Sequence, residues 1–356
     1  MSFLRKHLRF RLLTWCLLFV FLSLIFFILG MGYYFSAPAY QGKISHHFTG
    51  ERFINLQAEK PRQSFAFFRW ISNRQKQSWR KEYLKPSIPV AFVDSDELKV
   101  TFVNHSTVLL QTQRLNILTD PIWSERCSPV SWAGPKRYHA PGIDFSALPV
   151  IHVVLMSHNH YDHFDLPTLK KLNDTFHPQF ITGLGNKILL EKNGIKNVTE
   201  LDWWEEIKIQ ENFFVNFVPA QHFSGRGLFD RNKTLWGGFV VRANAGNIYY
   251  SGDTGFHPPF EKIYQRYGAM RLALLPIGAY EPRWFMKPVH INPEEAVKAH
   301  QILNAQTSVA VHFGTFRLAD EGQFTPIIDL FTALQKEKIS PQDFWVLKPG
   351  EGRLVK

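Results

Sequence analysis

Residues 157–163 read Ser-His-Asn-His-Tyr-Asp-His and directly follow an apolar stretch that is typical of a buried strand. A single loop histidine is usually packed or solvated, but four side chains of metal-ligand type within six residues are hard to explain by packing. Neutral imidazole and carboxylate groups are suitable ligands for Zn²⁺. The spacing lets His158 and His160 reach one ion while Asp162 and His163 reach a second, so this loop predicts a two-metal site.

Two ions need more ligands than one loop holds, and three later segments offer them at the ends of apolar runs. His222 ends the segment Val-Pro-Ala-Gln-His, Asp253 lies in Ser-Gly-Asp-Thr-Gly, and His312 lies in Val-His-Phe-Gly-Thr. With the loop they make seven candidate ligands, a set that is much larger than chance clustering would give.

Strand-like runs alternate with single helical segments along the rest of the chain. This alternation indicates two sheets with helices outside, although periodicity alone does not separate this arrangement from other α/β folds. The expected strands are residues 99–103, 108–112, 115–119, 150–156, 213–218, 238–241, 248–251, 272–276 and 308–312, and the expected helices are residues 166–172, 293–303 and 327–336.

The ordered signature His-x-His-x-Asp-His, then His, then Asp, then His resembles that of the metallo-β-lactamase superfamily. The resemblance implies an α/β fold, the αββα sandwich, with two Zn²⁺ ions as cofactors. It also implies a role for each ligand: His158, His160 and His222 on the first zinc, Asp162, His163 and His312 on the second, and Asp253 bridging both. Asp120 matches the aspartate that orients the ligand loop in that family.

Longer segments are similar to N-acylphosphatidylethanolamine phospholipase D and its bacterial relatives over roughly residues 99–350. They include PAQHFS (219–224), GDTGF (252–256), PIGAYEPRWFMKPVHINPEEAV (276–297) and HFGTF (312–316). This likeness implies a phospholipid substrate, whose phosphorus a metal-bridging hydroxide would attack to release N-acylethanolamine and phosphatidic acid. It also places His290 at the active site as a catalytic residue and substrate contact, and makes Gln221 and Tyr280 weaker candidates for the substrate pocket.

Residues 12–31 hold no charge across 20 positions, which is enough helix to cross a hydrocarbon core of about 30 Å. This run is longer than the apolar region of most cleaved signal peptides, so we expect an uncleaved, single-pass anchor. Basic residues crowd its N-terminal side, which favours a catalytic domain outside the cytoplasm. The expected organisation is a basic flank (1–11), a transmembrane anchor (12–35), a basic and aromatic juxtamembrane segment (36–90) and the catalytic domain (91–356).

The net charge of +11 is concentrated near this anchor. Residues 1–90 carry 14 of the 41 Lys and Arg but 3 of the 30 Asp and Glu, so residues 91–356 are formally neutral. A nucleic-acid enzyme would be expected to carry basic charge on its catalytic domain, so we expect a membrane with anionic headgroups as partner and no nucleic acid. Residues 61–85 suit a headgroup interface or a helix packed on the domain, and a homodimer is left open.

Three other functions remain open on the sequence. The same fold supports hydrolysis of a lactone or a β-lactam amide, and it supports nucleic-acid phosphodiesterases. The neutral catalytic part and the apolar span argue against the nucleic-acid enzyme. A metal-binding scaffold without activity is the third alternative, and the complete set of seven ligands argues against it.

Overall fold

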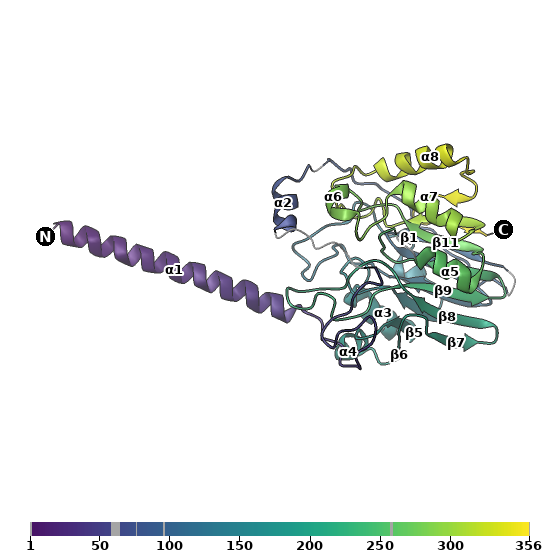
Figure 1. The fold of residues 1–356 in the computed structure, drawn as a ribbon, viewed down its shortest axis with the longest axis horizontal. Coiled ribbons are helices and arrows are strands. Elements are labelled where there is room, and N and C mark those ends of the chain that lie inside the picture. Colours follow the sequence, from purple (N-terminus) through teal and green to yellow (C-terminus); the bar gives the residue numbers. More distant parts are fainter. Residues whose placement is uncertain (1, 58–64, 76, 95–96, 257–258, 356) are drawn as a thin grey trace.

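Two seven-stranded sheets carry most of the chain in the computed structural model, which describes residues 2–57, 65–75, 77–94, 97–256 and 259–355 (Figure 1). The first sheet has the order β14-β1-β2-β3-β4-β5-β6 and the second has the order β13-β12-β11-β10-β9-β8-β7. The strands of the first sheet are β1 Lys99–Asn104, β2 Thr107–Thr112, β3 Leu115–Thr119, β4 Val153–Met156, β5 Gln179–Gly183, β6 Val198–Leu201 and β14 Gly352–Leu354. Those of the second are β7 Glu206–Gln210, β8 Phe213–Val218, β9 Gly238–Ala243, β10 Gly246–Tyr250, β11 Leu272–Pro276, β12 Thr307–Val311 and β13 Phe344–Trp345.

The sheets pack face to face because their strands alternate between two apolar faces. In β2, Val108 and Leu110 join the core that also holds Val215 of the second sheet, while Leu109 points to the other side. There it meets Leu169 of a covering helix. The helices outside the sheets are α3 Leu166–Phe176, α4 Lys187–Lys192, α5 Pro259–Tyr267, α6 Arg283–Met286, α7 Pro293–Ile302 and α8 Thr325–Glu337. The αββα sandwich predicted from the sequence is therefore confirmed.

The strand directions bring the candidate ligands to one edge of the sandwich. Strands β10, β11 and β12 run parallel, and β8 has the same direction because it and β10 both pair antiparallel with β9. The segments after β8, β10 and β12 therefore meet at the C-terminal edge of the second sheet. The loop after β4 leaves the first sheet beside them.

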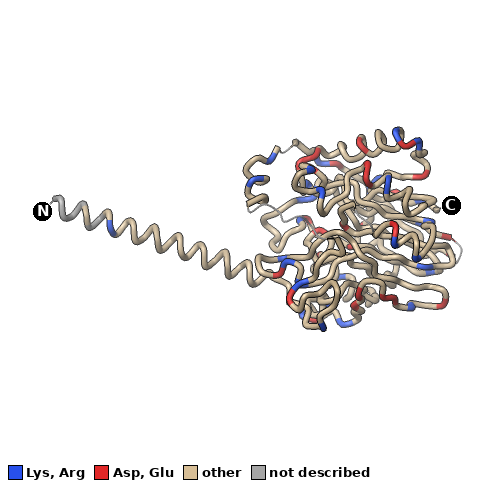
Figure 2. The backbone as a smooth tube through the Cα atoms, in the orientation of Figure 1, with Lys and Arg blue, Asp and Glu red and all other residues tan. Residues whose placement is uncertain are grey.

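The N-terminal helix α1 (Ser2–Tyr34) extends away from the sandwich and, among its described side chains, almost all are exposed (Figure 1). Residues Phe10–Tyr34 are long and apolar enough to cross a membrane, and no part of that window is buried against the protein. Figure 2 shows the described part of this helix almost free of charged residues, whereas both signs of charge are scattered over the sandwich.

The segment between α1 and β1 packs on the sandwich over part of its length. Phe48 and Phe53 are buried in the main core, so part of the predicted juxtamembrane segment (36–90) packs on the sandwich, while the predicted domain bounds stay a prediction. Helix α2 (Ala66–Ser72) rests on α6, where the Trp70 and Phe285 rings stack with centroids 5.0 Å apart. Its other aromatic side chains are exposed, so the segment has both a packed face and a free apolar face.

Candidate metal centre

Three histidines form the first group of convergent ligand atoms. His158 and His160 lie in the loop after β4, and His222 lies in the segment after β8. The Nε2 atom of His158 lies 2.8 Å from Nδ1 of His160, which is 3.3 Å from Nε2 of His222. These are the three residues that the family resemblance assigned to the first zinc.

The Nδ1 atoms of His158 and His222 point away from the ligand group, and their hydrogen bonds determine that Nε2 presents a lone pair toward it. Nδ1 of His222 lies 2.9 Å from the Val289 carbonyl oxygen, which can only accept, so this nitrogen donates and Nε2 presents its lone pair inward. Nδ1 of His158 lies 2.9 Å from the Ser157 hydroxyl, whose proton goes to Asp120. It therefore donates in the same way. Outer hydrogen bonds of this kind are what hold histidine ligands in the metal-binding tautomer.

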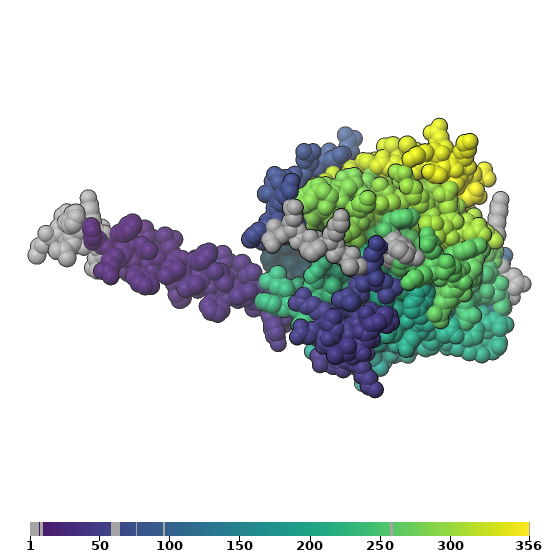
Figure 3. Space-filling view, viewed as in Figure 1, coloured from purple at the N-terminus to yellow at the C-terminus, as the bar shows by residue number. Residues whose placement is uncertain are grey.

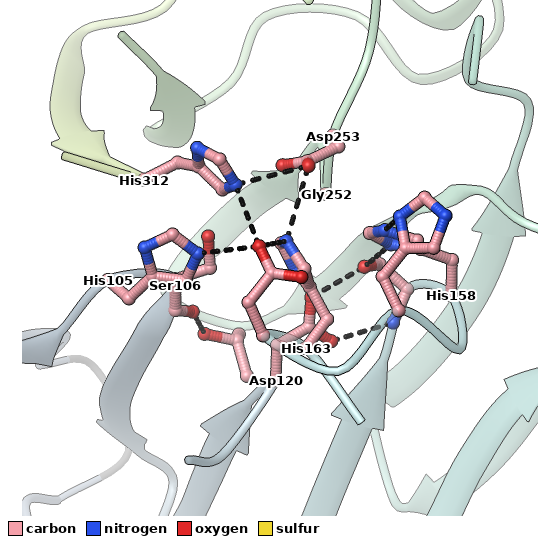
Figure 4. A network of polar contacts seen from close by, with 12 residues as sticks. His105, Ser106, Asp120, His158, His163, Gly252, Asp253 and His312 are labelled. Atoms are coloured by element: carbon pink, nitrogen blue, oxygen red, sulfur yellow. Dashed lines mark hydrogen bonds and ion pairs between the residues drawn. The ribbon is translucent and has the colours of Figure 1, made fainter. Parts of the chain in front are cut away.

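A second group lies beside the first and is drawn in Figure 4. Asp162, His163 and His312, the residues assigned to the second zinc, place their ligand atoms within 4.8 Å of one another, together with His105. The Oδ2 atom of Asp162 lies 3.3 Å from Nε2 of both His163 and His312 and 3.0 Å from Nε2 of His105. His105, which the sequence predicts to have a supporting or structural role, lies against the carboxylate of a candidate ligand.

Asp253, which the family resemblance predicts to bridge two ions, lies between the two groups. Its Oδ2 atom is 3.1 Å from His312 and 3.2 Å from His163 in the second group. It is also 3.8 Å from Nε2 of His222 in the first group. The loop after β10 thus places one oxygen within reach of both sets of nitrogens.

The protonation of the two groups differs because their surroundings differ. Burial lowers the pKa of His160 to about 4 and holds the pKa of His158 and of His222 well below its usual range, so these rings are neutral at pH 7. In the second group burial also acts to lower the pKa of His312, but the Asp253 and Asp162 carboxylates outweigh it and raise that pKa to about 9. Neutral imidazole is the form that binds a metal ion. The first group is therefore already in that form at pH 7, whereas His312 would lose a proton when an ion binds.

The donor set fits a metal ion on a second, independent ground. In the part of the chain that the structure describes, several buried polar atoms in or beside the two groups lack a hydrogen-bond partner, although buried polar atoms almost always have one. Those beside the ligand atoms are His163 Nε2, Asp253 Oδ1 and His290 Nδ1. A cluster of nitrogen and oxygen donors whose lone pairs point at a common centre is the arrangement that a divalent cation satisfies.

Asp120 supports the ligand loop (residues 157–163) from the side that faces away from the two ligand groups. It is fully buried and accepts hydrogen bonds from the Ser157 amide at 2.7 Å, the Ser157 hydroxyl at 2.5 Å, His163 Nδ1 at 2.6 Å and the Tyr250 hydroxyl at 2.5 Å. Both Asp120 and His312 adopt positive φ angles, 33° and 61°, which are uncommon for non-glycine residues.

A cavity of about 900 Å³ opens above the two groups. His290 lines it, with Nδ1 3.8 Å from Asp253 Oδ2, whereas Gln221 and Tyr280 are not among the described residues that do. The Gln221 amide donates to the Gln57 carbonyl, and the Tyr280 hydroxyl donates to Asp329 beside a neighbouring cavity of about 480 Å³. A contact of either side chain with substrate stays a prediction.

Three residues that were not predicted hold the candidate ligands in place. Asn55, from the segment before α2, donates to the His222 carbonyl at 2.9 Å and accepts from the His222 amide at 3.2 Å. Tyr250 donates to Asp120. Arg226 donates to the Asn159 and Phe164 carbonyls, at either end of the ligand loop. No local motif marks them, since each acts on a distant part of the chain.

Replacing Asn55 with alanine is expected to lower the free energy of unfolding by about 2 kcal/mol, because the buried His222 amide and carbonyl lose their partner. Thermal unfolding in detergent would measure the loss. Asn173→Ala on the surface of α3 is the control and should change little. Equal midpoints for the two variants would contradict this role for Asn55.

Three comparisons with known proteins agree with this geometry. A family model described as a beta-lactamase superfamily domain matches residues 115–313. The N-acyl-phosphatidylethanolamine-hydrolyzing phospholipase D 1 of Caenorhabditis elegans is 36% identical over 290 residues, which cover 76% of this chain and 81% of that protein. The mitochondrial N-acyl-phosphatidylethanolamine-hydrolyzing phospholipase D of Saccharomyces cerevisiae is 37% identical over 66% of this chain and 52% of that protein. The solved isothiocyanate hydrolase from Delia radicum gut bacteria has a TM-score of 0.57 at 19% identity, over 72% of this chain and 98% of that one, a likeness that concerns the fold alone.

Proposed function

Since this chain belongs to the metallo-β-lactamase superfamily and is a metal-dependent hydrolase, we propose that it is a membrane-anchored phospholipase D that uses two zinc ions. Its substrate would be N-acylphosphatidylethanolamine, and its products N-acylethanolamine and phosphatidic acid. The observation that carries the proposal is the position of the two ligand groups at the base of a large cavity with apolar walls. The described apolar side chains of those walls include Phe65, Phe67, Phe68, Phe285, Met286 and Val289.

A charged centre beneath apolar walls suits an amphiphile better than a small polar substrate. The phosphodiester would lie over the ligand groups, and the acyl chains would lie along the phenylalanines. Arg226 and Arg231 also line the cavity and supply positive charge for a phosphate. DNA and RNA fit less well, because the formal charge of residues 91–356 is zero.

The donor chemistry supports zinc at this site. Imidazole and carboxylate are borderline ligands that suit Zn²⁺, and the two groups with a carboxylate between them match a two-ion site. Two zinc ions bound there would supply Lewis acidity toward the phosphoryl oxygens and lower the pKa of a nearby water.

The protein's own residues then bind and orient the reacting groups. In the hydrolysis, a water oxygen bonds to phosphorus, the bond from phosphorus to the headgroup oxygen breaks, and a water proton ends on that oxygen. Asp253 lies where its carboxylate can stay a ligand during this exchange. Burial lowers the pKa of His290 to about 4, so its neutral ring can donate a hydrogen bond to a substrate oxygen in the cavity.

His290→Gln is expected to lower kcat/KM by about 100-fold while leaving the bound metal unchanged, because a positioned hydrogen-bonding group on the substrate is lost. Steady-state kinetics with elemental analysis would measure both. His177→Gln, at the exposed end of α3, is the control and should retain full activity. Loss of metal from His290→Gln would instead make His290 a ligand, which its place beside His222 and Asp253 also allows.

The cellular placement is part of the same proposal. We infer that α1 is an uncleaved anchor and that the basic residues before it keep its N-terminus in the cytoplasm, so the sandwich lies on the other side. Fusing a reporter that is active only outside the cytoplasm to the C-terminus tests this orientation, and an inactive reporter would contradict it.

The proposed reaction is tested by incubating purified, metal-quantified full-length protein with mixed phospholipids and identifying the products by mass spectrometry. N-acylethanolamine and phosphatidic acid, lost on chelation and restored by zinc, would support it. Lysolipid with free fatty acid, or no lipid product, would contradict it. A lactone, a β-lactam and single-stranded DNA, tested in parallel, cover the alternative reactions of the fold.

A further inference from the structure

The C-terminal end of the membrane helix packs against a loop of the catalytic cavity, which we name the junction loop (residues 225–230). The Leu228 amide donates to the Gly32 carbonyl at 3.3 Å, and the Phe229 amide donates to the Ser36 hydroxyl at 3.2 Å. The contact depends on two glycines, because a Cβ on Gly227 would lie 2.4 Å from the Gly32 oxygen. Figure 3 shows α1 leaving the sandwich beside this region.

A buried carboxylate binds the junction loop to Ala37, which lies three residues after the end of the helix. Asp230 is 1% exposed and accepts hydrogen bonds from the Ala37 amide at 2.7 Å, the Arg226 amide at 2.9 Å and the Gly227 amide at 2.8 Å. Hydrogen bonds from backbone amides to an ionised carboxylate are among the stronger ones in proteins. These hydrogen bonds therefore hold the helix end and the loop together.

The junction loop is hydrogen-bonded to the ligand loop (residues 157–163). The Gly225 amide donates to the Asn159 side chain at 2.8 Å, and the Arg226 guanidinium donates to the Asn159 carbonyl at 2.8 Å. Residues 225–228 also line the cavity above the two ligand groups. Few residues thus separate the membrane helix from the candidate ligands.

The exposed tyrosines at the end of α1 indicate where the helix leaves the bilayer. Tyr33 and Tyr34 end α1 and are 76% and 78% exposed, as is typical of aromatic residues at a membrane–water interface. Leu228 and Phe229 bond to the same turn and are 59% and 43% exposed, so they lie at that level. On the cavity's other rim, α2 presents two exposed phenylalanines, Phe67 and Phe68, and Phe65 precedes it; the helix lies on the side of the sandwich from which α1 leaves (Figure 1).

We propose that α1 and the junction loop hold the mouth of the cavity against the leaflet in which α1 ends, with Leu228, Phe229 and the α2 phenylalanines inserted at the boundary of headgroups and acyl chains. This proposal rests on the proposed function, in which α1 anchors the enzyme in a membrane, and adds the surface that contacts the lipid. The apolar rim faces a lipid leaflet, and the cavity opens to lipids of the enzyme's own membrane.

The docking is tested on the full chain in nanodiscs with a fluorescent label at Phe68→Cys, in a Cys16→Ala background that leaves only the buried Cys127. Nitroxide lipids are expected to quench the label, because an inserted apolar rim lies about 5–10 Å into the boundary region. A label at Glu211→Cys, in the turn at the far end of β8 from the site, is the matched control. Equal quenching at the two positions would overturn the proposal.

The role of the junction is tested by a matched pair in α1. Gly32→Val places a side chain where the Leu228 side chain lies 2.4 Å away, whereas Gly30→Val meets no described atom within 4 Å. Gly32→Val is expected to reduce quenching at position 68, and Gly30→Val to preserve it. Identical quenching in both variants would overturn the junction's role.

A kinetic comparison tests the choice of leaflet. Substrate in the enzyme's own nanodisc is expected to be hydrolysed, and substrate in separate nanodiscs is expected to remain intact. Equal rates would contradict the proposal that the cavity opens to the enzyme's own membrane. If no lipid is hydrolysed at all, the proposed function fails, while the quenching result still decides the docking.

Discussion

Asp253→Asn is expected to reduce kcat by about a thousandfold or more, since the loss of several kcal/mol of charge stabilisation at a metal site corresponds to at least three powers of ten. The amide keeps the shape of the side chain, so the sandwich should still fold. It removes the negative charge that lies 3.1 Å from His312 and 3.2 Å from His163. His158→Ala, which deletes a nitrogen of the first group, should have the same outcome.

The measurement combines turnover, elemental analysis and circular dichroism on each variant. Asp174→Asn is the control, because Asp174 is an exposed carboxylate on α3 that pairs with Lys170. It should behave as the parent protein does. Retained activity in Asp253→Asn or His158→Ala would contradict the mechanism.

Asp120→Ala is expected to lower the free energy of unfolding by about 3–5 kcal/mol, because it leaves four buried donors without their acceptor. It should also weaken metal binding by about 10- to 100-fold, since His163 and Ser157 lose the group that orients them. The two effects have one cause, the loss of a carboxylate that is fully buried.

The two effects can be separated with a second buried carboxylate. Asp165 accepts from the Ser124 amide, the Ser124 hydroxyl and the Thr168 hydroxyl, and it contacts none of the candidate ligands through these bonds. Asp165→Ala should therefore lower the thermal midpoint but leave metal affinity unchanged. An unchanged metal affinity in Asp120→Ala as well would show that Asp120 supports the fold alone.

The sequence predicted the elements whose pattern is local. The expected strands at residues 213–218 and 272–276 coincide with β8 and β11, and helix α7 begins at Pro293 as its capping box requires. The expected strand at residues 150–156 is three residues too long, because β4 begins at Val153. Strand β7 was not predicted; its Glu-Ile-Lys-Ile-Gln run lies at the edge of the sheet and is partly exposed.

The candidate site also combines residues with a local pattern and residues without one. Four of its seven ligand positions lie within six residues, so their spacing alone pointed to a metal. The supporting contacts do not repeat at any short period. Asn55 reaches His222 across 167 positions, Tyr250 reaches Asp120 across 130, and Arg226 reaches Asn159 across 67. Only the folded chain brings such pairs together.

The distribution of the ligands between the two sheets has a consequence for how the protein holds its shape. The ligand loop belongs to the first sheet, while His222, Asp253 and His312 follow strands of the second. Ions held between them would cross-link the two halves of the chain at the open edge of the sandwich, much as a disulfide closes a long loop. Chelation should therefore free the sheets to separate at that edge, and amide hydrogen exchange should rise first in the segments after β4, β8, β10 and β12.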